Sequence, residues 1–318
     1  MKVFISGNIA DSGLKLLAQN NIIVSNWKEA RQITSSELID ACRDVDALVS
    51  VGPNKLDASF LQSCKHLKVI ALHSVGFDNV DVEEARRLNI PIGNTPGVLS
   101  GATADTAFLL MLAVSRKAFY LHKKILNDQW QNYEPTPELG IELHGKTLGI
   151  FGMGKIGLEM AKRCIGAYQM KVIYHNRKRN EQAEAVLGAK YVSFDELIEQ
   201  SDVISVHTAL TPETKGKFDM AVFEKMKPRS IFINTARGGI HNEEDLITAL
   251  QNNLIWGAGL DVTNPEPMSV DNPLLNMESV AVLPHIGSAT QETRNAMADL
   301  VAKNIIAGLR GEKLPHQV

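Results

Sequence analysis

Short runs of β-branched and other apolar residues alternate with helical patterns along almost the whole chain. In the first hundred residues the pattern predicts four strands, near Lys2–Ser6, Ile22–Ser25, Ala47–Ser50 and Lys68–Leu72. The segments between these strands have a helical period, and one begins with the capping box Thr34-Ser-Ser-Glu37. This alternation is typical of an α/β fold with parallel sheets.

A second alternating series begins at Thr147. Its strands are expected near Thr147–Phe151, Lys171–Tyr174, Val203–Val206, Ser230–Asn234, Gly257–Leu260 and Val280–Leu283. Between the two series a helix of about Gly101–Ala118 is apolar almost all round, which predicts burial between domains or subunits. A last helical segment, from about Gly287 to Leu309, is expected to pack back onto the first domain.

Composition narrows the class of protein. A chain of 318 residues is long enough for two domains. A net charge of −3 without a basic tail argues against a nucleic-acid partner. The longest apolar run, Ala107–Val114, is far shorter than the ~20 residues of a membrane span, and the start of the chain reads as a strand rather than an export signal. The three cysteines have no zinc or redox spacing. We therefore expect a cytoplasmic protein with no bound metal and no membrane partner.

The strand at Thr147 leads into a glycine-rich turn with the pattern G-x-G-x-x-G, formed by Gly152, Gly154 and Gly157. A helical pattern follows, which is the context that a dinucleotide-binding loop requires. The first glycine permits the tight turn, the second lets backbone N–H groups approach a pyrophosphate, and the third lets the helix pack close to the strand. The alternative is a plain strand–turn–helix connection.

The next strand ends in a basic stretch. NAD enzymes usually carry an Asp or Glu there, about 20 residues beyond the loop, which binds the ribose 2′-hydroxyl. This chain has Asn176, followed by Arg177, Lys178 and Arg179. A carboxylate repels a 2′-phosphate, whereas an amide and several cations bind one. We therefore expect NADP as the preferred cofactor and NAD as the alternative. The competing interpretation of these residues is a basic turn that is exposed to solvent and binds no ligand.

Three later segments place a polar residue just beyond a predicted strand, at the sheet edge where α/β proteins bind ligands. These residues are Arg237, Glu266 and His285. A guanidinium matches the geometry of a carboxylate, and histidine exchanges a proton near neutral pH, with a neighbouring carboxylate favouring its charged form. Together they suit chemistry on a 2-keto acid. Taken singly, each could be an ordinary ion-pair, turn or helix-start residue.

Several motifs now occur in a recognisable order, and over essentially its whole length the chain resembles the D-isomer-specific 2-hydroxyacid dehydrogenase family. The motifs that carry the resemblance are His73-Ser-Val-Gly-Phe-Asp-Asn-Val-Asp81, Asn94-Thr-Pro-Gly97, Gly152-Met-Gly-Lys-Ile-Gly157, Ser201-Asp-Val-Ile-Ser-Val-His-Thr208, Asn234-Thr-Ala-Arg-Gly238, Asp261 to Pro267, and Pro284-His-Ile-Gly-Ser-Ala-Thr290. The resemblance implies a Rossmann-type doubly wound domain at residues 99–286. It also implies a smaller flavodoxin-like α/β substrate domain formed by residues 1–98 and 287–318.

The resemblance also implies residue roles. His285 would protonate the substrate carbonyl oxygen, Glu266 would orient and charge it, and Arg237 would bind the carboxylate and carbonyl. Substrate would further be bound at Ser74, Val75 and Gly76. Expected cofactor contacts are Thr103, Gly152, Met153, Gly154, Lys155, Ile156, Gly157, Asn176, Arg177, Lys178, His207, Thr208, Thr235, Ala236, Asp261 and Gly287, with Asp261 on the nicotinamide amide. Three further histidines match no catalytic position of the family and are expected to be structural or pocket-wall residues: His73, His207 and His241.

The activity implied by the resemblance is NAD(P)H-dependent reduction of a small 2-keto acid to the D-2-hydroxy acid. The short chain and basic stretch look most like glyoxylate/hydroxypyruvate reductases and 2-ketogluconate reductases. An NAD-linked D-lactate-like or phosphoglycerate-type dehydrogenase is the alternative. A dinucleotide-sensing corepressor is the alternative of another class, although no groove for a partner peptide can be identified in the sequence. The family habit also implies a homodimer.

Overall fold

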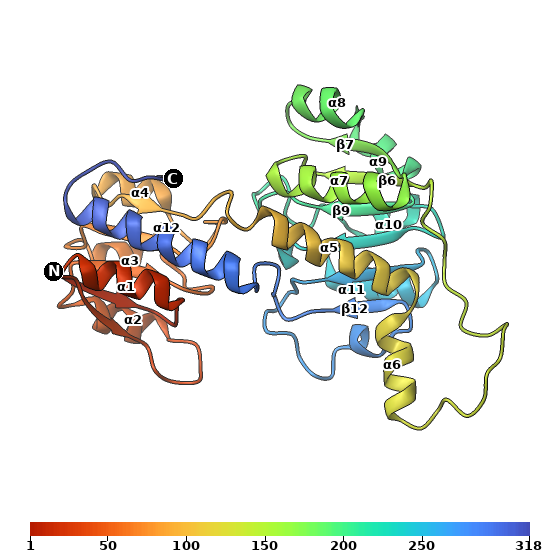
Figure 1. The fold of residues 1–318 in the computed structure, drawn as a ribbon, viewed down its shortest axis with the longest axis horizontal. Helices are drawn as coiled ribbons and strands as arrows, with labels where there is room; N and C mark the ends of the chain where they lie inside the picture. The colour runs from red at the N-terminus through yellow and green to blue at the C-terminus, as the bar shows by residue number, and fades with distance from the viewer. The chain divides into compact units, whose positions relative to one another are not determined.

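The computed structural model describes residues 1–318, which divide into two compact units (Figure 1). The first unit contains Met1–Leu99 and Ser288–Val318, and the second contains Ser100–Gly287. Each unit is built on one fully parallel sheet.

The sheet of the first unit has five strands in the order β2-β1-β3-β4-β5, which is the flavodoxin-like order. Their bounds are β1 (Lys2–Ile5), β2 (Ile23–Asn26), β3 (Ala47–Ser50), β4 (Val69–Leu72) and β5 (Ile92–Gly93).

Both faces of this sheet are covered by helices, because its strands are apolar on both sides. Ile70 and Leu72 point into a core shared with α2 (Ser35–Cys42), α3 (Ala58–Ser63) and α4 (Val82–Arg87). Val69 and Ala71 alternate to the opposite face, where α1 (Asp11–Gln19) and α12 (Gln291–Leu309) pack. The carboxyl-terminal helix therefore completes the first unit.

The second unit has seven parallel strands in the order β12-β11-β10-β9-β6-β7-β8. The strand order reverses at β6, which is the Rossmann arrangement with one strand added at the β12 edge. The bounds are β6 (Thr147–Phe151), β7 (Lys171–His175), β8 (Lys190–Tyr191), β9 (Val203–Val206), β10 (Ile231–Asn234), β11 (Gly257–Leu260) and β12 (Val280–Val282).

One face of this sheet is covered by α5 (Ser100–Ser115) and α7 (Lys155–Tyr168), which lie side by side (Figure 1). The opposite core involves α9 (Phe194–Gln200), α10 (Met220–Lys225) and α11 (Glu243–Gln251). The remaining elements are α6 (Ala118–Leu126), α8 (Glu181–Leu187) and the 3₁₀ turns η1 (Gly238–Ile240) and η2 (Pro273–Asn276).

The apolar composition of α5 is accounted for by its packing on the sheet. Its side chains pack on strand glycines: a Cβ at Gly259 would lie 2.9 Å from the Cβ of Leu110. The long apolar helix is thus buried largely against the sheet of its own unit. It also ends earlier than predicted, because Lys117 adopts a left-handed conformation with φ of 51° and separates α5 from α6.

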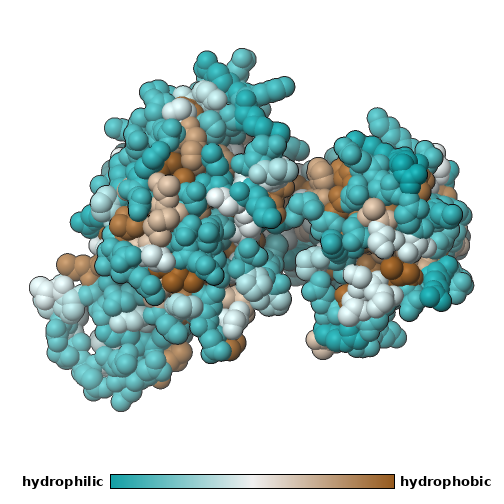
Figure 2. All heavy atoms as spheres, turned by 180° about the vertical axis from the view of Figure 1, so that it is seen from behind, coloured by the Kyte–Doolittle hydropathy of each residue, from teal (hydrophilic) through white to brown (hydrophobic).

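All ten predicted strands are present with boundaries shifted by at most a residue or two, and the predicted fold class is confirmed. No helix in the structure has the length and apolar character needed to span a bilayer. The face of the molecule drawn in Figure 2 is mostly hydrophilic, and its hydrophobic side chains form separate groups.

Candidate functional site

The glycine-rich turn has the geometry of a phosphate-binding loop. Gly152 has a φ of +104°, and a Cβ there would lie 2.7 Å from the carbonyl carbon of His207. A Cβ at Gly157 would lie 2.5 Å from the oxygen of Gly152, so only glycine lets α7 begin this close to the strand. Gly154, in contrast, faces open space.

The start of α7 is also suited to an anion. Gly154 is its N-cap residue, and no side chain caps the helix. The first N–H groups of the helix are therefore available, and the helix dipole adds a partial positive charge at this end. The predicted contacts Lys155 and Ile156 lie in this first turn. An open glycine, uncapped N–H groups and the helix dipole together fit a dinucleotide pyrophosphate.

The basic stretch after β7 is held against this loop. The Oδ1 of Asn176 accepts a hydrogen bond from the N–H of Met153 at 2.7 Å. Arg177 and Lys178 are exposed and form no ion pair, whereas Arg179 is paired with Glu184. Of the three cations in this stretch, two therefore form no ion pair, and they lie beside the amide of Asn176.

The residues predicted to be catalytic come together beyond β10, β11 and β12. The Nδ1 of His285 lies 2.6 Å from Oε1 of Glu266, and both side chains are partly exposed. Burial tends to raise the pKa of Glu266, but the hydrogen bond and charge of His285, with smaller contributions from the Thr263 N–H and the Arg237 guanidinium, lower it overall. The pair is thus a carboxylate that supports a histidine, with a guanidinium charge nearby.

Arg237 is placed by the turn that follows β10. The side chain of Asn234 accepts the N–H of Ala236 at 3.0 Å and donates to the carbonyl of Arg237 at 2.9 Å. A Cβ at Gly238 would lie 2.0 Å from the carbonyl oxygen of Thr263, so this turn packs directly on the segment that carries Glu266. The sequence motif around Arg237 therefore encodes its position as well as its charge.

His285 has a left-handed backbone, with φ of +54°. This conformation costs a non-glycine residue on the order of 1 kcal/mol, so it must be held by its surroundings. Buried Asp261 does so by accepting the N–H groups of Ile286 at 2.8 Å and Gly287 at 2.7 Å. Burial raises the pKa of Asp261, although both N–H bonds oppose this. Gly287 also packs close to Thr103. The expected contact of Asp261 with a nicotinamide amide stays a prediction.

The remaining predicted cofactor contacts follow β9 and β10. His207 and Thr208 touch Gly152 through their backbone. The Oγ1 of Thr235 and the Nδ1 of His207 are buried without a hydrogen-bond partner within the chain. Buried polar atoms normally have a partner, so these two atoms also fit a site that receives a polar ligand.

In the first unit, Ser74, Val75 and Gly76 form a loop directly after β4. The three loop carbonyls accept hydrogen bonds from Thr95 N–H, Asn94 Nδ2 and Ser74 Oγ. No hydrogen bond within the chain uses the N–H groups of Val75 or Gly76. The loop therefore offers donors only, which suits a carboxylate.

The other histidines of the motifs are poor proton donors at neutral pH. Burial lowers the pKa of His207 to about 3 and that of His241 to about 4. The pKa of His73 is lowered to about 4, by burial and then by the charge of Arg294. Each is neutral at pH 7, which agrees with a structural role.

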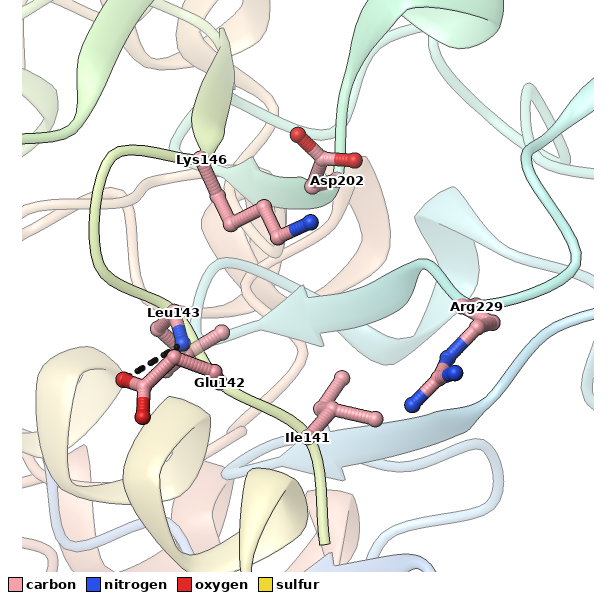
Figure 3. A pocket seen from close by; sticks show the side chains of 6 residues that line it. All are labelled: Ile141, Glu142, Leu143, Lys146, Asp202 and Arg229. Atoms are coloured by element: carbon pink, nitrogen blue, oxygen red, sulfur yellow. Dashed lines mark hydrogen bonds between the residues drawn. The ribbon is translucent and has the colours of Figure 1, made fainter.

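A cavity of about 240 Å³ lies elsewhere in the second unit (Figure 3). Lys146, Asp202 and Arg229 line it and lie just before strands β6, β9 and β10. This is the amino-terminal edge of the sheet, whereas the predicted site residues follow the carboxyl ends of the strands. The cavity is therefore separate from the candidate site.

Sequence reasoning missed the residues that hold the site in place. Asn234 fixes the turn of Arg237, and Asn180 and Glu184 fix the basic stretch. One signal was visible: Asn180 precedes a helical pattern that begins with Glu181, as an N-cap residue does. The bonds to other segments had no sequence signal.

Fold and site together define a dinucleotide-binding α/β protein with a histidine–glutamate pair and a guanidinium at the carboxyl edge of its sheet. The sequence profile described as "D-isomer specific 2-hydroxyacid dehydrogenase, NAD binding domain" matches residues 108–287. A glyoxylate reductase of Thermococcus litoralis is 43% identical over 321 residues, which cover 100% of this chain and 96% of that protein.

Solved structures agree. The chain has a TM-score of 0.93 and 37% identity to a crystal structure of a Thermus thermophilus protein, with 100% of both chains covered. An NADPH-dependent glyoxylate/hydroxypyruvate reductase from Sinorhizobium meliloti, solved with NADP and malonate, has a TM-score of 0.87 at 31% identity and covers 100% of this chain and 96% of its own. The chain belongs to the D-isomer specific 2-hydroxyacid dehydrogenase family.

Proposed function

We propose that this protein is an NADPH-dependent reductase of glyoxylate and hydroxypyruvate that forms the D-2-hydroxy acid where the product is chiral. The observation that carries the proposal is the pair of His285 and Glu266 beside the charge of Arg237, in the unit that holds the phosphate loop. Relatives named as glyoxylate reductases at 37–43% identity over the full chain support the substrate class.

In this proposal the loop Gly152–Gly157 and the start of α7 hold the pyrophosphate, and Asn176, Arg177 and Lys178 hold a 2′-phosphate. The other predicted contacts follow the carboxyl ends of β9, β10, β11 and β12, except Thr103, which lies in the first turn of α5 near Gly287. The reduced nicotinamide, when bound, supplies a hydride for the keto carbon. This unit, Ser100–Gly287, is the proposed dinucleotide-binding domain, and the first unit is the proposed substrate domain.

The proton comes from His285. Its Nδ1 is bonded to Glu266, which leaves Nε2 as the nitrogen that donates to the carbonyl oxygen of the substrate as the hydride arrives. Glu266 compensates the imidazolium charge before the transfer. Arg237 binds the substrate carboxylate with its planar pair of N–H donors. Ser74, Val75 and Gly76 are also assigned to substrate binding, through the unused N–H groups of their loop.

The experiment that tests this function measures kcat/KM for a panel of 2-keto acids with NADPH and with NADH. We expect glyoxylate and hydroxypyruvate to be the best substrates, ahead of pyruvate and 2-ketogluconate. We expect NADPH to be preferred by about tenfold or more, because each charge-assisted hydrogen bond contributes roughly 1.5–3 kcal/mol. A clear preference for NADH would overturn the cofactor assignment. Absence of turnover with every keto acid would overturn the enzymatic function.

We also propose that the protein acts as a homodimer in the cytoplasm, where its three buried free cysteines stay reduced. Large apolar side chains are exposed on α6 and the segment that follows it, among them Trp130 at 67% and Tyr133 at 84%. Isolated exposed apolar residues are common, but a group on one segment favours a protein contact.

A double variant, Trp130→Ser with Tyr133→Ser, is expected to convert the dimer to a species near the 34.9 kDa of one chain in sedimentation equilibrium. The matched control is Val270→Ser, which removes an apolar side chain that is 83% exposed elsewhere. A monomeric wild-type protein, or a double variant that still forms dimers, would contradict this assignment of the contact surface.

A further inference from the structure

The turn between β7 and α8 is attached at both ends to one residue of the phosphate loop. At its start, Asn176 accepts the N–H of Met153 at 2.7 Å. At its end, the Nδ2 of Asn180 donates to the carbonyl of Met153 at 2.8 Å. Met153 lies between Gly152 and Gly154, and its side chain is buried. The basic residues 177–179 therefore lie between two hydrogen bonds to the backbone of Met153. We call the bond to Asn176 the first support and the bond to Asn180 the second support.

Asn180 is more than a helix cap. Its Oδ1 accepts the N–H of Ala183 at 3.1 Å and so caps α8, and its own N–H donates to the hydroxyl of Tyr174 at 2.7 Å. Capping needs only a side-chain oxygen, which serine also provides. The bond to Met153 needs the amide N–H₂. These two roles can be separated by substitution.

The first support also determines what Asn176 presents. Because its Oδ1 is used by Met153, the free end of the amide is the donor Nδ2. A donor suits the oxygens of a phosphate. An aspartate at this position would present a second negatively charged oxygen instead.

Glu184 forms an ion pair with Arg179, the third cation of the turn. Its carboxylate binds Arg179, with Arg179 Nε at 3.0 Å, and accepts the hydroxyl of Tyr174 at 2.6 Å. The bond from Arg179 and then that from Tyr174 lower the pKa of Glu184 to about 2, so it stays charged at neutral pH. Arg179 is thus neutralised and turned towards α8, while Arg177 and Lys178 remain unpaired.

We propose that Asn180 and Glu184 set the selectivity for a 2′-phosphorylated dinucleotide. Asn180 is a positioning residue that fixes the basic turn relative to the loop that binds the pyrophosphate. Glu184 limits the cations offered to the 2′-phosphate by withholding Arg179. This inference rests on the proposed preference for NADPH and names the residues that tune it.

The test measures binding, not turnover. Isothermal titration of the full chain with ADP-ribose and with 2′-phospho-ADP-ribose gives a selectivity ratio, the dissociation constant of the first divided by that of the second. Glu184→Gln is expected to raise this ratio about three- to fivefold by releasing Arg179, with the gain falling at high salt. Asn180→Ser keeps the cap and the charge and is expected to lower the ratio by a similar factor.

Glu181→Gln is the matched control, because it removes the same charge from the first turn of the same helix without releasing Arg179. The selectivity ratio of Glu181→Gln is expected to stay near that of the wild type. If this ratio rises as much as in Glu184→Gln, the effect of Glu184 is only that of removing a negative charge, and its proposed role is overturned. If the wild-type ratio is at or below one, the proposed NADPH preference fails. If the wild type prefers the 2′-phosphate but neither Glu184→Gln nor Asn180→Ser changes the ratio, the preference stands and this inference fails. Should Asn180→Ser not fold, Glu184→Gln alone decides.

Discussion

Replacing His285 with alanine is expected to lower kcat by about 10²–10⁴, the usual contribution of a positioned general acid. The reason is the geometry of the pair: Nδ1 of His285 is bonded to Glu266 at 2.6 Å. Burial lowers the pKa of the other motif histidines, His73, His207 and His241, well below neutral. In the proposed mechanism, alanine removes the donor of the proton that must reach the substrate oxygen. It leaves the phosphate loop and the basic turn untouched.

The measurement pairs steady-state kinetics with NADPH binding followed by fluorescence. Dinucleotide affinity should stay close to that of the wild type while turnover falls. His144→Ala is the control, because His144 is exposed in the segment before β6 and its ring makes no hydrogen bond. Near-normal kcat in His285→Ala would remove this histidine from the mechanism.

Prediction from the sequence succeeded where one local signal decides the structure. The strands were visible because each is a short apolar run bounded by turns, and parallel pairing then aligns their carboxyl ends. The register pairs Val206 with Asn234 and Asn234 with Leu260, so the residues that follow these strands meet at one edge. For this reason the positions of Arg237, Glu266 and His285 relative to the strands were enough to predict that these three residues lie at the same edge of the sheet.

Two strands and one helix boundary were missed for a shared reason. Strands β5 and β8 have two residues each, too few for any period to be recognised. The end of α5 depends on the left-handed conformation of Lys117, and no glycine or proline marks that position. Structure that depends on tertiary contacts leaves little pattern in the chain.

The sequence left open whether two or three cations of the basic turn are available to a 2′-phosphate. Three cations follow Asn176 in the sequence, yet Arg179 is bound by Glu184, which lies in the first turn of α8. Likewise, Asn176 was expected to help bind a 2′-phosphate, but the sequence did not predict that its Oδ1 accepts the N–H of Met153. Side-chain direction decides both points, and spacing along the chain does not specify it.

Arg237→Lys is expected to raise KM for the keto acid about ten- to hundredfold, with a smaller change in kcat. Lysine keeps the charge but has no planar pair of donors, so one or two charge-assisted hydrogen bonds to the substrate carboxylate are lost, at roughly 1.5–3 kcal/mol each. The backbone of residue 237 should stay in place, because Asn234 holds its carbonyl and Gly238 packs against Thr263. The variant therefore tests the side chain rather than the turn.

Saturation curves for glyoxylate and hydroxypyruvate at fixed, saturating NADPH give both constants. Arg229→Lys is the matched control: it makes the same substitution at an exposed arginine on the amino-terminal edge of the sheet, and its KM should equal that of the wild type. If KM for both acids is unchanged in Arg237→Lys, the guanidinium does not bind the carboxylate. In that case the loop of Ser74, Val75 and Gly76, with its unused N–H groups, becomes the stronger candidate for this role.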